Sequence, residues 1–188
     1  NAAVLQQQTI NRPVSFSGVG LHSGNRVTMT FTPAPPNSGV RFRRVDLEGK
    51  PEVEARVENV VETTRSTTLG KGNMKVQTVE HVLAALTGMG VDNAYIDIDG
   101  PEVPIMDGSA GPFVFLIQSA GIELQPSAKR FVRVRRCVEV EDGDKWARFE
   151  PHEGALHGVG RRPEGEAHVM AEARRSRRAP TAGVHVEE

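Results

Sequence analysis

Hydrophobic and polar residues alternate along much of the first half of the chain, a pattern that predicts β-strands with one buried face. Val27, Met29 and Phe31 alternate with threonines, and a period of two residues returns in 40–43 and 53–57. Strict alternation is typical of antiparallel sheets that have one face in water, rather than of buried parallel sheets. We therefore expect a mostly antiparallel sheet.

The period then changes to that of a helix. The apolar positions that share one helical stripe are Val79, Val82, Leu83, Leu86 and Met89. Thr78 is a suitable N-cap, and Gly88 or Gly90 a suitable end. After a short strand over 94–98, Ser109 can cap a second helix that runs to about Ala120. The first 122 residues or so therefore predict about five strands and two helices in an α+β layered sandwich.

The character of the chain changes after this region. Residues 126–129 resemble a linker, and Val138–Val140 and Trp146–Phe149 predict a hairpin that starts a second, similar domain over 123–150. Residues 151–188 contain no Ile, Phe, Tyr, Trp, Lys, Asn or Asp. Because such a segment buries little apolar surface, we expect a disordered or out-of-frame tail. A reading-frame shift near residue 150 is one explanation, and a divergent tail or a low-complexity linker is the other.

Composition narrows the class of protein. The 188 residues are 38% hydrophobic and 25% charged, as in soluble globular proteins. No apolar run approaches the roughly 20 residues of a transmembrane helix. The net charge of −1 argues against a nucleic-acid partner, and the short run Arg174–Arg178 does not change that expectation. A lone cysteine, Cys137, and the lack of a secretory signal favour a cytoplasmic location.

The strongest chemical signal is the pair Glu80–His81 at the predicted start of the first helix. A helix N-terminus favours carboxylate and neutral imidazole, and neutral imidazole is the form that binds metals. An adjacent glutamate is well placed to handle a metal-bound water. The alternative is structural: a glutamate that stabilises the helix start beside an exposed histidine. Spacing alone favours that alternative.

Two further segments have special backbones. Gly100–Phe113 combines prolines, glycines and helix-capping residues, which predicts a rigid loop that leads into a helix. Gly18–Gly24 lacks the Lys-Ser/Thr of a phosphate-binding P-loop, and we expect a bend with an available His22. On the first helix, Ala84, Ala85 and Gly88 form a strip of small residues beside the histidine, which suits either ordinary packing or a site at an interface.

Taken together, five segments in this order resemble the UDP-3-O-acyl-N-acetylglucosamine deacetylases of lipid A synthesis. The segments are Gly18–Gly24, Thr63–Leu69, Thr78–His81, Gly90–Ala94 and Pro104–Phe113. The resemblance covers roughly residues 6–150. It implies two similar domains with an active site between them, and zinc-dependent hydrolysis of the acetamide of UDP-3-O-(3-hydroxyacyl)-N-acetylglucosamine.

The resemblance also implies roles for particular residues. His81 matches the first zinc (Zn²⁺) ligand, and Glu80 matches the general base that deprotonates the zinc-bound water. His22 matches a residue near the site, and the loop that contains Thr67 matches one beside it, so both are expected to bind substrate at the periphery. The family's other two zinc ligands are a His and an Asp four residues apart on a helix. No histidine in this chain has an aspartate four positions later; His168 is followed by Glu172, outside the family's motif.

Two functional hypotheses follow. The first is the zinc-dependent amidohydrolase, in a truncated form whose activity alone is expected to be low. The alternative is a non-catalytic domain that keeps the fold and binds a nucleotide-sugar or a protein partner. The missing ligands favour this alternative, whereas the complete Glu80–His81 pair favours the enzyme. We also expect an uncovered interdomain face around Ala84 and Gly88, where self-association can occur.

Overall fold

The computed structural model describes residues 5–131, 134–143, 145–149, 151, 155–157, 160–161, 167–168 and 172–174. The chain divides into two compact units, Asn1–Lys129 and Arg130–Glu188. The division falls after Lys129, whereas the sequence analysis placed the first boundary at residue 122.

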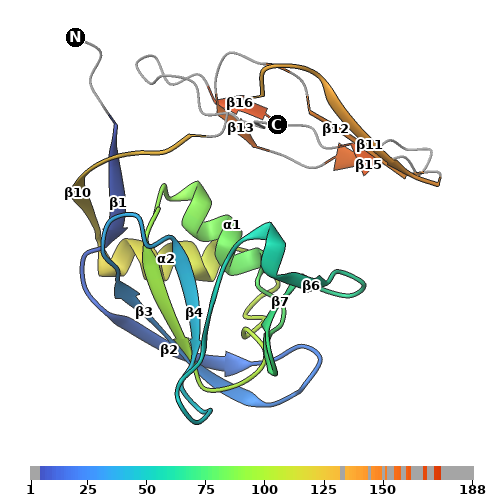
Figure 1. The fold of residues 1–188 in the computed structure, drawn as a ribbon. Coiled ribbons are helices and arrows are strands. Elements are labelled where there is room, and N and C mark those ends of the chain that lie inside the picture. The colour runs from blue at the N-terminus through green and yellow to red at the C-terminus, as the bar shows by residue number, and fades with distance from the viewer. Residues whose placement is uncertain are drawn as a thin grey trace. The chain divides into compact units, whose positions relative to one another are not determined.

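A five-stranded sheet forms the centre of the first unit (Figure 1). Its strands, in spatial order, are β2 (Val14–Val19), β3 (Arg26–Pro33), β9 (Ala94–Ile98), β4 (Val40–Arg44) and β5 (Glu52–Glu54). All neighbouring pairs are antiparallel except β4 and β9, which run parallel. The predicted alternation is confirmed on β3, where Val27, Met29 and Phe31 are buried.

Two helices, α1 (Glu80–Gly88) and α2 (Gly111–Ala120), pack against one face of this sheet (Figure 1). The helical residues that join the hydrophobic core are Val82, Ala85, Leu86, Phe113, Ile117 and Ala120. Phe16 of β2 meets Phe113 edge to face, with 5.7 Å between ring centroids. The expected α+β sandwich of a mostly antiparallel sheet and two helices is confirmed.

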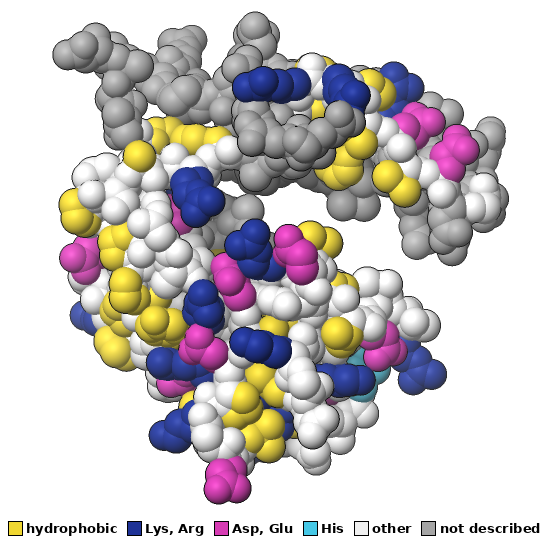
Figure 2. Space-filling view, in the orientation of Figure 1, with side chains coloured by type: hydrophobic (Ala, Val, Ile, Leu, Met, Phe, Trp, Pro, Cys, Tyr) yellow, Lys and Arg dark blue, Asp and Glu magenta, His cyan; other side chains and the backbone are white. Residues whose placement is uncertain are grey.

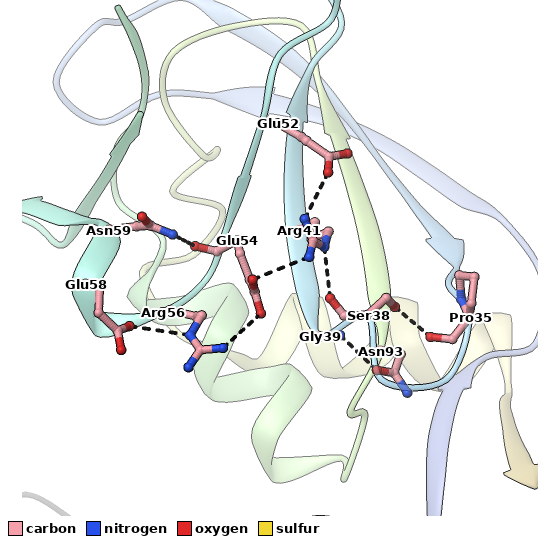
Figure 3. A network of polar contacts seen from close by, with 10 residues as sticks. All are labelled: Pro35, Ser38, Gly39, Arg41, Glu52, Glu54, Arg56, Glu58, Asn59 and Asn93. Carbon is pink, nitrogen blue, oxygen red and sulfur yellow. Dashed lines mark hydrogen bonds and ion pairs between the residues drawn. The ribbon is translucent and has the colours of Figure 1, made fainter. Parts of the chain in front are cut away.

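The opposite face of the sheet is polar. Arg41 on β4 bonds Glu52 at 2.9 Å and Glu54 at 3.4 Å, and Arg56 lies between Glu54 and Glu58 (Figure 3). Such solvent-exposed ion pairs contribute little stability, about 0 to 1 kcal/mol each. Their role is to keep one face of the sheet in water while the helices bury the other.

The ends of both helices differ in detail from expectation. Helix α1 ends at Gly88, as predicted, and Gly90 follows with a positive φ of 74°, which glycine adopts without strain. Helix α2 begins after Ala110, and Ser109 is not its N-cap. Instead the Ser109 hydroxyl accepts the Gly111 N–H at 3.1 Å, in a small turn that precedes the helix.

Residues 5–122 contain nine complete strands, more than the five expected. A second sheet joins β6 (Val60–Glu62), β7 (Thr68–Lys71) and β8 (Met74–Val76). Val57, expected on a strand, begins a 3₁₀ turn over Val57–Asn59 and is 80% exposed. Strands of three residues carry too little pattern to be recognised from the alternation of side chains.

The predicted linker is also wrong, because Pro126 lies inside strand β10 (Ile122–Ala128). Among the described strands, β10 pairs with β1 (Gln6–Ile10) alone, in a two-stranded sheet whose register shifts between Gln6 and Gln8, opposite the proline. Edge strands and bulges are the places in a sheet that tolerate a residue without an N–H.

Asn93 connects this pair of strands to the main sheet. Its side chain is 1% exposed, donates to the amide oxygens of Gln7 at 2.8 Å and Gln125 at 2.7 Å, and accepts the Gly39 N–H at 2.9 Å. Every polar atom of this buried amide is therefore paired, which is the condition under which burial of an amide is tolerated.

The second unit begins with the predicted hairpin, which is confirmed. Strand β11 (Val138–Asp142) pairs antiparallel with β12 (Lys145–Phe149). Four short strands follow, β13 (Ala155–His157), β14 (Gly160–Arg161), β15 (Ala167–His168) and β16 (Glu172–Arg174), and they pair as β13 with β16 and β14 with β15. The other positions of the expected tail, apart from residue 151, lie outside the described residues.

Neither α1 nor α2, the helices found in the described ranges, has the length and apolar character that a membrane span requires. On the face of the first unit seen in Figure 2, acidic and basic side chains are interspersed.

We predict that Asn93→Ala lowers the free energy of unfolding by about 3 kcal/mol, because it leaves the buried amide oxygen of Gln125 and the Gly39 N–H without partners and removes one of the two donors to the amide oxygen of Gln7. Urea unfolding followed by circular dichroism measures this. Asn73→Ala, at an exposed turn, is the matched control and should change stability by less than about 0.5 kcal/mol. Equal effects of the two substitutions would contradict the assigned role of Asn93.

Candidate active site at the start of helix α1

The chain turns sharply just before α1. Thr78 has a φ of +60°, a strained value for a β-branched residue, and Val79 is the N-cap without a side-chain hydrogen bond. The expectation that Thr78 caps the helix is therefore wrong. Its hydroxyl donates instead to the Oε1 atom of Glu102, at 3.1 Å in the interior.

Glu80 is the first residue of α1, and its carboxylate is held by the residue that precedes strand β7 (Thr68–Lys71). Its Oε2 atom accepts the Thr67 N–H at 3.0 Å, while the Thr67 carbonyl accepts the Val79 N–H at 3.2 Å. These two bonds connect the segment before β7 to the helix start. Within the described part of the chain, the Oε1 atom of Glu80 has no hydrogen-bond partner.

His81 follows on the helix and is half-buried. Neither of its ring nitrogens bonds another of the described residues, so the imidazole is available to a ligand. Ala84 and Gly88 lie on the same helical face and are exposed, but Ala85 is only 1% exposed. The predicted strip of small residues is therefore narrower than expected, because Ala85 belongs to the core.

The loop that begins at Gly100 lies alongside the residues before α1. The Gln77 N–H donates to the Pro101 carbonyl at 2.8 Å, and the Val103 N–H donates to the Gln77 carbonyl at 2.9 Å. Farther along, the Ile105 N–H donates to the Val19 carbonyl at 3.0 Å, at the end of β2. The expected rigid loop is thus held by backbone hydrogen bonds on both sides.

Glu102 is the buried centre of this region, at 0% exposure. Its carboxylate accepts the backbone N–H of His22 at 3.0 Å and of Ser23 at 2.8 Å, and its Oε1 atom lies 2.8 Å from His22 Nδ1. Burial by itself raises the pKa of Glu102. The hydrogen bonds from His22 and Ser23 outweigh burial and lower that pKa to about 2.

His22 lies on a bend, as expected, but the bend is not free. Its backbone and Nδ1 atom are both engaged by Glu102, and its side chain is 31% exposed. Gly20 permits this close approach, because a Cβ atom there would lie 2.5 Å from the Oε2 atom of Glu102. The glycine is therefore required for packing against a carboxylate, a need that no sequence pattern indicated.

Four separate segments of the chain meet at this place. Residues 18–24, 67–69, 77–81 and 100–105 are joined by the bonds described above. Sequence reasoning identified the catalytic candidates among them but missed Glu102, which gave no signal beyond its position between two prolines. The structure brings the Thr67 N–H to the Glu80 carboxylate, and it brings His22 and Thr78 to the same oxygen of Glu102.

The described residues do not form a complete metal site. Within them, no group of three or more His, Cys, Asp or Glu side chains is close enough to hold a metal ion. His168 and Glu172 lie on different strands, β15 and β16. A catalytic zinc usually takes three protein ligands, so one imidazole from His81 fits such a site only as a part of it.

Comparison with known proteins finds a matching family model and similar curated relatives. The family described as LpxC, UDP-3-O-acyl N-acetylglycosamine deacetylase, matches residues 7–162. The UDP-3-O-acyl-N-acetylglucosamine deacetylase of Methylococcus capsulatus is 58% identical over 151 residues, and that of Pseudomonas entomophila is 56% identical over 151 residues. Each alignment covers 80% of this chain and 50% of the relative, so the chain spans about half the length of the curated relatives it matches.

The low pKa of Glu102 predicts a loss of stability in acid. The folded chain binds the proton more weakly than the unfolded chain, whose glutamate pKa is 4.5. The stabilisation is therefore complete above about pH 4.5 and is lost as the pH falls toward 2. We predict that Glu102→Gln costs on the order of 3 kcal/mol at pH 7 and reduces the slope of stability against pH below 4.5.

Urea unfolding at a series of pH values measures both quantities. The matched control is Glu52→Gln, whose side chain is 43% exposed and pairs with Arg41 at the surface. The control should keep the steep acid slope. An unchanged slope in Glu102→Gln would show that this carboxylate titrates as it does in the unfolded chain.

Proposed function

Because the chain belongs to the UDP-3-O-acyl-N-acetylglucosamine deacetylase family, we propose that it supplies the Glu80–His81 part of a zinc-dependent deacetylase site. The proposed substrate is UDP-3-O-(3-hydroxyacyl)-N-acetylglucosamine, a precursor of lipid A. The proposed products are acetate and the free amine. The whole reaction is proposed for a full-length protein, because the chain spans about half the length of its relatives.

The observation that carries the proposal is the state of the two neighbouring side chains. One carboxylate oxygen of Glu80 is held by the Thr67 N–H, while the other has no partner among the described residues. The His81 side chain is half-buried, and neither ring nitrogen bonds another of the described residues. A glutamate that only stabilised the helix start would not need an unpartnered imidazole beside it.

Hydrolysis requires a proton to move twice. The water loses a proton as its oxygen bonds the acetyl carbon, and the amine gains one as the C–N bond breaks. A carboxylate held by one oxygen can do both with the other, because its position does not change between the two transfers. In our proposal Glu80 takes the first proton and returns it to the leaving nitrogen.

His81 is the proposed ligand for zinc. The bound ion would lower the pKa of water and polarise the amide carbonyl. Because one imidazole holds zinc weakly, we expect little turnover from the described residues alone. His22 and Thr67 are proposed to border the substrate, Thr67 through its backbone contact with Glu80.

Two finer proposals concern the surroundings of the site. The exposed free thiol of Cys137 suits a reducing compartment, and we place the reaction in the cytoplasm. The exposed residues Ala84 and Gly88 of α1 are small enough to let another layer approach closely, and we propose that the chain self-associates through this face.

The alternative proposal is a non-catalytic domain that keeps the fold and binds a nucleotide-sugar or a partner. It is favoured by the lack of a three-residue ligand group within the described ranges. The two proposals differ in what they require of Glu80: a binding domain needs its bond to Thr67, but not its proton transfer.

A chimera separates the two proposals. Residues 7–150 of this chain would replace the matching part of the Methylococcus capsulatus deacetylase, and zinc-dependent release of acetate would be measured. We predict an active chimera in which Glu80→Gln lowers kcat by about 10²–10⁴-fold at unchanged zinc content. We expect His81→Ala to lose both zinc and activity.

Glu58→Gln, on the exposed 3₁₀ turn, serves as the control and should leave turnover unchanged. A folded chimera with no activity would support the binding domain. Full activity in Glu80→Gln would show that the proton is handled elsewhere.

A further inference from the structure

A second pair of side chains, Glu102 and His22, is not used by the proposed proton transfers. Glu102 is completely buried, whereas the His22 side chain is 31% exposed. Their separation of 2.8 Å, between Oε1 and Nδ1, is that of a hydrogen bond. The Nδ1 atom therefore faces a fixed buried group, and the Nε2 atom bonds none of the described residues.

The chemistry of this contact determines which ring nitrogen carries the proton. An ionised carboxylate only accepts hydrogen bonds, so the hydrogen between the two groups must belong to Nδ1. The low pKa of Glu102, about 2, keeps the carboxylate ionised at neutral pH. In the neutral ring, Nε2 is then left with a free lone pair.

The orientation of the ring is fixed as well. The same carboxylate accepts the backbone N–H groups of His22 and Ser23, so the bend cannot turn without breaking all three contacts. Its Oε1 atom also accepts the hydroxyl of Thr78, two residues before Glu80. Because His22 and Thr78 bond the same oxygen, the imidazole lies beside the start of α1.

We propose that Glu102 is a positioning residue: it holds His22 in the Nδ1–H form and presents Nε2 beside the start of α1 as a hydrogen-bond acceptor for a substrate hydroxyl. The hydrogen bond to a substrate hydroxyl rests on the proposed function, but the tautomer of His22 and its cause do not. Glu102 itself is buried and does not touch the substrate. It acts only through the ring and the bend that it holds.

Nitrogen chemical shifts of the imidazole test the proposal directly. Long-range ¹H–¹⁵N correlation spectra of the ¹⁵N-labelled chain would be recorded at pH 8, where an ordinary histidine is neutral. The His22 signals are assigned by their loss in His22→Gln. We expect a protonated Nδ1 and an unprotonated Nε2, the reverse of the form that free histidine prefers in water.

Two substitutions then test the cause. In Glu102→Gln the ring should move toward the tautomer mixture of free histidine, because the amide group cannot satisfy the three donors of the bend. Glu52→Gln removes a surface carboxylate from the same unit and should leave the His22 signals unchanged. An unaltered His22 tautomer in a folded Glu102→Gln chain would overturn the proposal.

The wild-type chain provides a test that does not depend on the folding of any Glu102 variant. If Nε2 of His22 carries the proton in the wild-type chain, the proposal is wrong. The spectra need neither zinc nor substrate, and His81→Ala should leave the His22 signals in place. An inactive chimera with a fixed Nδ1–H ring would therefore refute the proposed function and retain this inference.

The chimera gives the functional readout. We expect His22→Gln and Glu102→Gln to raise KM about tenfold with a smaller change in kcat, since both act on substrate binding. The double variant should be little worse than Glu102→Gln alone. If the increases in KM caused by the two single substitutions multiply in the double variant, Glu102 does not act through His22.

Discussion

A single buried carboxylate organises the region around the start of helix α1. Glu102 has no exposure to water, and an ionised group in such a place is tolerated only when hydrogen bonds replace its hydration. His22, Ser23 and Thr78 supply them. Two otherwise unfavourable features follow from this requirement: a β-branched residue at positive φ, and a bend whose Gly20 must lack a side chain. Removing one partner leaves the charge buried, so the contacts depend on one another.

The sheet and helices determine where this carboxylate can act. The polar face of the sheet remains in water, while the opposite face packs against α1 and α2. That packing fixes the position of α1, and the backbone bonds of Gln77 to Pro101 and Val103 fix the loop beside it. Glu80 is then held by Thr67, the residue that precedes β7 of the three-stranded sheet. Glu80 and His81 are thus oriented by separate segments of the chain, and these segments also contribute Leu69, Val79 and Val103 to the hydrophobic core.

Periodicity predicted the larger elements well, because β3, β9, α1 and α2 each bury a regular face. It failed where the decisive contact is not periodic. Thr78 has the residue type of an N-cap, but its hydroxyl bonds a distant carboxylate. Pro126 has the composition of a linker, but an edge strand with a bulge accommodates it. Glu102 was missed because glutamate is normally exposed, and only the fold shows which three residues donate hydrogen bonds to it. The resemblance to the deacetylases indicated Glu80 and His81 as catalytic and metal-binding candidates, whereas spacing alone favoured a structural role for both.

Family membership and geometry support the same proposal, in which the chain contributes a base and one imidazole to a larger catalytic site. The central physical claim is narrower: the carboxylate of Glu102 holds the His22 bend rigidly against the start of α1. Native-state hydrogen exchange of the His22 and Ser23 amides tests it most directly. Both residues are exposed, so slow exchange would come from the bonds of these amides to Glu102 and not from burial. The account predicts that these two amides exchange as slowly as those of β3 in the core. Exchange at the rate of an unprotected surface loop would contradict it.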